Sequence, residues 1–200
     1  MDKELLPTIL GAIERKDQIT LMHISKVQQY VNFMIPALTQ KNIITDDDIP
    51  NLWISAILHD VGKIFISEQL LKKKEKLTQG EKLQLREHTK KGYNFLKSSF
   101  YSEKILDAIR HHHERWDGKR TGEYPGYPDG LKGYDIPLYA RIIQVADAFD
   151  AMTAYRPYKK TKTDLEALEE IKNLSGTQFD PYIAHLFVES YMKFKAALIN

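Results

Sequence analysis

The run Ala-Ile-Leu-His-Asp-Val-Gly-Lys at residues 56–63 places an adjacent histidine and aspartate at the end of an apolar stretch. A neutral imidazole offers one nitrogen and a carboxylate offers two oxygens, so His59 and Asp60 can hold one metal ion and reach a second. Gly62 permits a close backbone approach, and Lys63 can place a positive charge beside an anion bound to such metals. A single His-Asp pair is weak evidence for a metal site, so the rest of the chain must supply further ligands.

Other histidines and one aspartate could complete a site with this pair. Taken singly, most of them fit a structural role: His23 fits a helix boundary, and His88 follows Arg and Glu on a polar face. Asp147 differs, because a carboxylate within the apolar run 145–149 is costly to bury without a partner or a metal. Helical proteins build metal sites from side chains that converge from several helices. The candidate ligands are His23, His59, Asp60, His88, His112, His113 and Asp147.

Composition limits the kind of protein that can carry these residues. With 200 residues, 42% of them hydrophobic and 28% charged, the chain fits one globular domain. The net charge of +2 does not favour a nucleic-acid polymer as partner. Cysteine is absent, so any metal must be held by nitrogen and oxygen ligands. No apolar run reaches the ~20 residues that span a bilayer, and no signal peptide is evident. These features predict a cytoplasmic protein with no membrane association.

The candidate ligands must be positioned by helices, because apolar residues recur with helical periodicity and no stretch shows strand alternation. The fold class is therefore predicted to be all-α, a single-domain helical bundle. Residues 1–17 are expected to form a lead-in helix and 18–200 the main domain. Pro36 is expected to kink or end the second helix. The predicted helices cover about 2–15, 17 or 20 to 36, 52–58, 78–96, 101–113, 137–152, 163–175 and 181 onward.

Three other features stand apart from the candidate ligands. The glycine-rich stretch 116–134 contains two Tyr-Pro pairs and must be a loop, and long loops in compact domains are usually functional. The basic run 72–74 is expected to be a solvated helix face or loop rather than a binding patch. His185 lies between Ala184 and Leu186 and is expected to pack in the core.

Together these motifs resemble the HD-GYP family, a branch of the HD-domain metal-dependent phosphohydrolases. The matching pieces occur in the family's order and extend from about residue 21 to residue 181. They are His23, the run 59–63, His88, the run 112–114, Gly126-Tyr127-Pro128-Asp129-Gly130-Leu131, Asp147 and Arg156-Pro157-Tyr158. The resemblance implies hydrolysis of cyclic di-GMP to the linear dinucleotide or to GMP by a hydroxide that bridges two metal ions.

The resemblance also implies roles for individual residues. One metal is expected to bind His23, His59, Asp60 and Asp147, and the other His88, His112 and His113, with Asp60 shared between them. Mixed imidazole and carboxylate ligands favour iron or manganese, while zinc, cobalt and nickel remain possible. Asp60 and Lys63 are the expected catalytic residues, with Lys63 at the scissile phosphate. The expected substrate contacts are Lys63, Tyr127, Asp150, Arg156 and Lys159.

The sequence departs from the family pattern at two places. Some members hold a third metal with a Glu where this chain has Ile19, so two metals are expected here. Between Asp117-Gly118 and Gly126 the family usually has one residue, whereas this chain has the seven residues 119–125. This insertion is expected to form either a lid or wall over the metals or a solvent-exposed excursion.

Alternatives to the cyclic di-GMP assignment come from different functional classes. The chain could be an HD-type phosphohydrolase for another cyclic dinucleotide or a nucleotide, which the insertion favours. It could instead be a catalytically weak nucleotide-sensing or interaction module, which the complete ligand set argues against. Least favoured is a helical bundle with surface histidines. The expected partner is a cyclic dinucleotide, and a homodimer or a regulatory domain, fused or separate, is possible.

Overall fold

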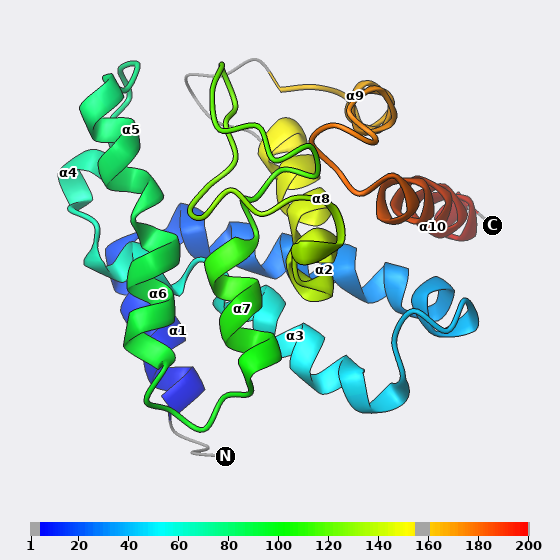
Figure 1. Ribbon diagram of the computed structural model, residues 1–200, viewed down its shortest axis with the longest axis horizontal. Coiled ribbons are helices and arrows are strands. Elements are labelled where there is room, and N and C mark those ends of the chain that lie inside the picture. Colours follow the sequence, from blue (N-terminus) through cyan, green and yellow to red (C-terminus); the bar gives the residue numbers. More distant parts are fainter. Residues whose placement is uncertain (1–4, 155–160, 200) are drawn as a thin grey trace.

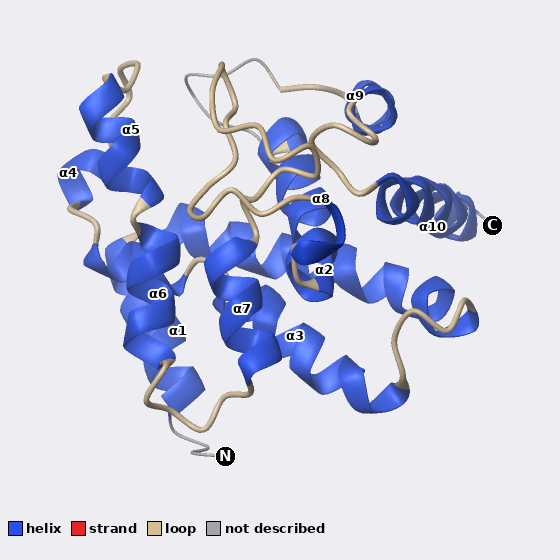
Figure 2. Ribbon diagram, in the orientation of Figure 1, coloured by secondary structure: helices blue, strands red, loops and turns tan. Residues whose placement is uncertain are grey.

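The predicted all-α class is confirmed by the computed structural model, which describes residues 5–154 and 161–199. Figure 2 shows helices joined by loops, and no strand occurs in the described residues, where Ser175 and Phe179 form one isolated bridge. The α-helices are α1 (Leu5–Lys16), α2 (Gln18–Gln40), α3 (Ile49–Leu58), α4 (Glu68–Leu71), α5 (Gln79–Arg86), α6 (His88–Leu96), α7 (Glu103–His111), α8 (Leu138–Thr153), α9 (Asp164–Asn173) and α10 (Pro181–Ile199). Short 3-10 helices are η1 (Asp46–Asp48), η2 (Val61–Phe65) and η3 (Gly133–Asp135).

Helix α2 is the longest helix of the described chain, and it packs against α1, α3, α8 and α10 (Figure 1). Asp17 caps its N-terminus, because the carboxylate accepts hydrogen bonds from the Ile19 N–H at 3.1 Å and the Thr20 hydroxyl at 2.6 Å. The helix continues through Pro36 to Gln40, so Pro36 does not end it. Proline lacks an N–H and so removes one hydrogen bond from the helix, and the packing of α2 against its neighbours offsets that cost.

Two clusters of buried apolar side chains form the core, and the candidate ligands lie where the clusters meet. The larger cluster joins α2, α3, α8, α9 and α10, and the smaller joins α1, α6 and α7 to the start of α2 and the end of α3. Helix α3 gives Ala56 to the larger cluster and Leu58, directly before His59, to the smaller one. Helix α2 likewise gives Val27 to the larger cluster and Ile24, the residue after His23, to the smaller one.

Two helix ends differ from the predicted boundaries. The prediction of a single helix over residues 78–96 is wrong, because α5 ends at Arg86 and α6 begins at His88. The predicted capping box of Thr78 and Glu81 does start α5. The break brings the His88 Nδ1 to within 2.8 Å of the Leu85 carbonyl oxygen near the end of α5. Similarly, α7 ends at His111 rather than at 113.

A glycine pair brings the backbone of η2 against α6. A Cβ atom on Gly62 would lie 1.8 Å from the His88 carbonyl oxygen and 2.6 Å from the Gly92 nitrogen. A Cβ atom on Gly92 would in turn lie 3.0 Å from side-chain atoms of Val61 and Ile109. Only a glycine at position 62 therefore permits the approach that sets Asp60 and His88 side by side.

Two further points concern surfaces. The prediction that His185 packs in the core is wrong, because 67% of its side chain is exposed and its Nε2 lies 3.5 Å from Glu189 on the next turn of α10. None of the helices in the described residues combines the length and the apolar character needed to cross a bilayer.

We expect Gly62→Ala to destabilise the fold by about 3 kcal/mol or more, because the new methyl group meets backbone atoms that cannot rotate away. Urea unfolding followed by circular dichroism measures this change. Gly80→Ala is the matched control: it lies in α5 with no atom within 4 Å of the added Cβ, so it should be neutral or stabilising by up to about 1 kcal/mol. Equal midpoints for the two variants would contradict the close approach.

Candidate metal centre

Three buried histidines have their ring orientation fixed by backbone carbonyls. Each Nδ1 lies close to the carbonyl oxygen three residues earlier: His59 to Ala56 at 2.8 Å, His88 to Leu85 at 2.8 Å and His112 to Ile109 at 3.0 Å. A carbonyl only accepts, so each Nδ1 must carry the proton and donate. The lone pair is then on Nε2, which points away from the backbone and toward the other candidate ligands.

The Nε2 atoms of His88 and His112 face each other at 3.4 Å. Because both Nδ1 atoms are donors in the neutral ring, this is a contact between two lone pairs and no hydrogen bond can form. Burial lowers the pKa of His88 to about 4 and holds the pKa of His112 well below its usual value, so both rings are neutral. A metal ion between the two nitrogens would accept both lone pairs and so remove their repulsion. The arrangement therefore fits a metal ion.

Two groups of side chains have donor atoms near enough to share an ion. One consists of His88, His112 and His113, and the other of His23, His59 and Asp60; within each group the donor atoms lie within 4.8 Å of one another. The structure thus brings together, from α2, α6 and the ends of α3 and α7, six of the seven ligands expected from sequence.

Asp60 lies between the two groups. Its Oδ2 is 3.6 Å from the His23 Nε2 and 3.5 Å from the His59 Nε2, while its Oδ1 is 3.3 Å from the His88 Nε2. Burial alone would raise the pKa of Asp60, but Lys63 and His59 hold it well below its usual range. The carboxylate is therefore ionised and presents one oxygen to each group, which is the geometry that a bridging ligand requires.

Asp147, the seventh expected ligand, also faces both groups. Its Oδ1 lies 3.0 Å from the His23 Nε2, and its Oδ2 lies 3.9 Å from the His113 Nδ1. Burial opposes ionisation of Asp147, but the hydrogen bond to His23 holds its pKa below its usual value. Burial also lowers the pKa of His113 to about 3, so this ring is a neutral donor.

His23 differs from the other ring ligands because a carboxylate, not a carbonyl, orients it. Its Nδ1 lies 2.7 Å from the Asp150 Oδ2, one helical turn after Asp147 on α8. Burial lowers its pKa, but the hydrogen bonds to Asp147 and Asp150 outweigh burial and raise it to about 9. Asp150, expected as a substrate contact, is only 2% exposed and directs its carboxylate at this ring.

Lys63 lies beside the bridging carboxylate, with its Nζ 2.5 Å from the Asp60 Oδ2. The side chain comes from η2, directly after the Gly62 approach, and 23% of it is exposed. Lys63 can therefore reach both Asp60 and a cavity of about 640 Å³ that it lines with His23. Such a position allows the ammonium group to meet an anion bound between the ligand groups.

Tyr127 covers the opposite side of the site. Its ring stacks on the His113 ring with centroids 4.7 Å apart, and the Arg86 guanidinium lies 5.3 Å from its centroid. A second cavity, of about 460 Å³, is lined by these three side chains and by Asp147. Residues 123–125 of the insertion also line this cavity, so part of the insertion forms a wall beside the candidate ligands.

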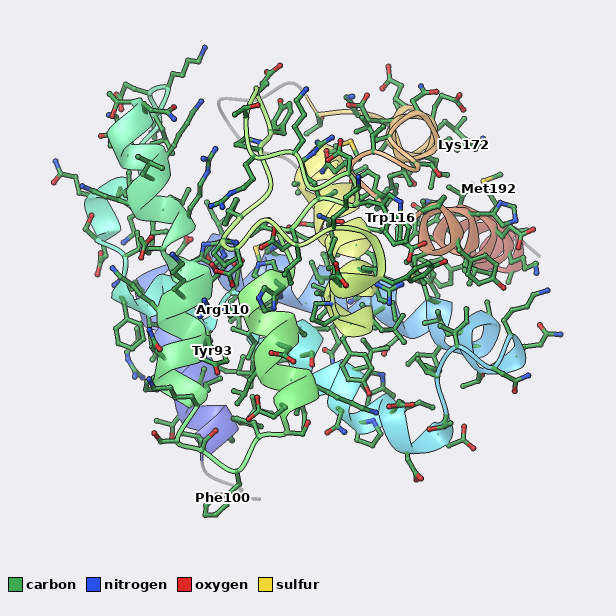
Figure 3. All side chains as sticks on the ribbon, in the orientation of Figure 1. Tyr93, Phe100, Arg110, Trp116, Lys172 and Met192 are labelled. Carbon is green, nitrogen blue, oxygen red and sulfur yellow. The ribbon has the colours of Figure 1, made fainter. Side chains whose placement is uncertain are left out.

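Glu114 supports the loop beside the candidate site, although sequence reasoning gave it no role of its own. It is fully buried, and its Oε1 accepts the N–H groups of Asp129 at 2.6 Å and Gly130 at 2.9 Å. On α7, Arg110 lies over Tyr93 and donates to the Asp129 carboxylate at 2.8 Å (Figure 3). These contacts hold the loop in the position from which Tyr127 reaches the site; the only sequence signal was the place of Glu114 directly after the histidines.

The remaining expected substrate contacts are Arg156 and Lys159. Both lie outside the described residues, between α8 and the segment that leads into α9. Their predicted roles stay predictions.

Comparison with known proteins agrees with this geometry. A family model described as HD domain matches residues 8–183. A relative in Xanthomonas campestris, the cyclic di-GMP phosphodiesterase response regulator RpfG, is 37% identical over 183 residues, which are 90% of this chain and 46% of the relative. The 3'3'-cGAMP-specific phosphodiesterase 2 of Vibrio cholerae is 31% identical over 198 residues, 97% of this chain and 36% of the relative.

A solved structure supports the fold. The crystal structure of a cyclic GMP-AMP-specific phosphodiesterase of Vibrio cholerae, V-cGAP3, matches 95% of this chain and 48% of its own with a TM-score of 0.63 at 20% identity. The chain thus spans less than half the length of each of these three proteins. On the match over residues 8–183 and the two sequence relatives, the chain belongs to the HD domain family, within its HD-GYP branch.

Proposed function

We propose that the chain is a metal-dependent phosphodiesterase that hydrolyses cyclic di-GMP to the linear dinucleotide, to GMP, or to both. The observation that carries this proposal is the Asp60 carboxylate, which directs one oxygen at each of two groups of imidazole nitrogens. Binuclear sites of this kind clamp the phosphoryl group in phosphodiester hydrolysis. Relatives named as cyclic di-GMP and cGAMP phosphodiesterases support the substrate class.

Two divalent ions would be held by the seven ligands, with iron or manganese favoured and zinc, cobalt or nickel possible. His23, His59 and Asp147 would serve one ion and His88, His112 and His113 the other, with Asp60 shared. When bound, the ions would polarise the phosphoryl oxygens and lower the pKa of a bound water. Ile19, 51% exposed on α2, offers no ligand atom for a third ion.

The chain's own residues would orient the substrate and stabilise its charge. Lys63 would exchange part of its contact with Asp60 for the scissile phosphate, whose negative charge grows during the reaction. Tyr127, held between His113 and Arg86, would offer its hydroxyl and ring edge to the substrate. Arg156 and Lys159 would supply further charged hydrogen bonds to the phosphate and guanine.

A second candidate substrate is 3'3'-cGAMP, or another cyclic dinucleotide. The insertion 119–125 favours it, because residues 123–125 line the cavity beside His113 and so alter the shape of the pocket. A panel of cyclic dinucleotides assayed with the same preparation separates these substrates. A nucleotide-sensing module would bind one of them without hydrolysis, and the presence of a full set of candidate ligands would then be unexplained.

The biological setting is also proposed by resemblance. We expect a cytoplasmic enzyme whose partner is a cyclic dinucleotide rather than a nucleic-acid polymer or a membrane. The relatives are more than twice as long as the matched region, which is compatible with a regulatory domain acting on this one. A homodimer is equally compatible, and light scattering of the purified chain would detect it.

Replacing Asp60 by Ala should abolish hydrolysis and reduce the metal content, because a shared carboxylate serves both ions. Lys63→Ala should keep two metals per chain yet lower kcat by roughly 10²–10³, the effect of removing one charge-stabilising donor. Elemental analysis of the two purified variants, with cyclic di-GMP turnover, measures both effects. Full activity in Asp60→Ala would remove the proposed site, and metal loss in Lys63→Ala would make that lysine a structural residue.

For Asp150 we propose a positioning role toward His23 in place of the substrate contact expected from sequence. Carboxylates that accept from a metal-bound imidazole fix its orientation and raise its basicity. Asp150→Ala should therefore weaken metal binding by roughly 10–100-fold. Asp150→Asn keeps an acceptor for the His23 Nδ1 and should recover most of that affinity. Titration of the apo-protein with Mn²⁺ gives these affinities. If Asp150→Ala binds Mn²⁺ as tightly as the wild type but has a raised KM, Asp150 contacts the substrate instead.

A further inference from the structure

Residues 67–86 form an arm that stands out from the helical body (Figure 1). We call this segment the arm; it carries α4 and α5, and N-caps at Ser67 and Thr78 define its two short helices. Helix α5 buries no side chain, and α4 buries only Leu70. An element that contributes so little to the core has side chains available for another purpose.

The arm carries five lysines, at positions 72, 73, 74, 76 and 82. The four that lie between α4 and α5 divide into two pairs according to their surroundings. Lys72 is bonded to Glu68 at 2.8 Å, and Lys73 reaches both oxygens of Glu81 at 2.7 and 2.9 Å. Lys74 and Lys76, by contrast, have no hydrogen-bonding or ionic partner among the described residues. Their ammonium groups are therefore free to meet an anion from outside the chain.

Lys74 and Lys76 line cavities that also reach candidate metal ligands. Lys74 and Lys76 line the cavity of about 640 Å³ whose other walls include His23 and Lys63. Lys76 also lines the cavity of about 460 Å³ that reaches His113 and Asp147. Lys76 thus lines two cavities that flank the candidate metal centre, one beside each group of ligands. Lys72 lines neither cavity, although it belongs to the same basic run.

The charge of the larger cavity favours an anionic ligand. Lysines 63, 73, 74 and 76 line it, together with the acidic side chains of Asp17 and Glu75. Lys63 and Lys73 are paired with Asp60 and Glu81, so Lys74 and Lys76 are the lysines of this wall that can meet a phosphate without breaking an ion pair. The apolar walls of the same cavity, from Ile19, Leu77 and Leu85, suit the faces of a nucleoside.

We propose that Lys74 and Lys76 bind the phosphate that is not being cleaved, so that the arm forms the second wall of the substrate site. The inference rests on the proposed function, since a cyclic dinucleotide has two phosphates on opposite sides of its ring. With one phosphate at the metal ligands beside Lys63, the other points away from them. The two lysines then contribute to substrate binding and leave the chemical step to residues 60 and 63.

The test compares Lys74→Ala/Lys76→Ala with Lys72→Ala as the matched control, using metal-loaded protein. With cyclic di-GMP and 3'3'-cGAMP as substrates, the double variant should raise KM about tenfold at low salt with kcat unchanged, and the difference should shrink at high salt. Lys72→Ala should behave as wild type, because its side chain lines neither cavity. Bis(p-nitrophenyl) phosphate, which has a single phosphate, should be hydrolysed equally by all three proteins.

Three results would overturn the inference while leaving the proposed function in place. The first is an unchanged KM in the double variant. The second is an equal rise of KM in Lys72→Ala, which indicates a general electrostatic effect. The third is a loss of bis(p-nitrophenyl) phosphate hydrolysis in the double variant, which indicates damage to the metal centre. A different result would contradict the proposed function itself. If the wild-type chain cleaves bis(p-nitrophenyl) phosphate but neither cyclic dinucleotide, the substrate class is wrong, and the role of the arm is rejected with it.

Discussion

The contact on which the site depends is the approach of imidazole nitrogens that cannot bond to each other. Backbone carbonyls fix the protons of His59, His88 and His112 on Nδ1, which leaves unprotonated Nε2 atoms pointing inward. Holding His88 and His112 at 3.4 Å with facing lone pairs is unfavourable by itself. Packing of the surrounding helices must supply the free energy that maintains it, and an electrophilic ion would convert it into a favourable arrangement.

The helix ends, rather than the helices themselves, create this arrangement. His59 follows α3, His88 begins α6 after the break from α5, and His112 and His113 follow α7. At a helix end, the imidazole ring can reach a carbonyl of the last turn. Consecutive side chains there no longer have to lie about 100° apart around the helix axis. For this reason His112 and His113 converge, while His111 turns toward Asp129.

Sequence patterns predicted much of this, and the failures have physical causes. Periodicity and capping residues located most helices, and the histidines and aspartates predicted as ligands do lie close together in the structure. The break at Glu87 was missed because the local pattern around His88 is compatible with one continuous helix. The contact of Asp150 with His23 was not predicted, because no local signal reveals that a side chain 127 residues away in sequence lies 2.7 Å from it. Such pairings depend on how α2 and α8 pack.

The division of the core into two clusters gives the candidate ligands a mechanical importance. Helices α2 and α3 contribute to both clusters, and His23 and His59 lie next to residues of the smaller one, Ile24 and Leu58. The chain has no cysteine, so no disulfide can link the two clusters. Metal ions bound there would link the helices that meet at the site. By mass action, the stability of the folded chain would then increase with the free metal concentration. Metal supply would then affect the stability of the folded protein as well as its chemistry.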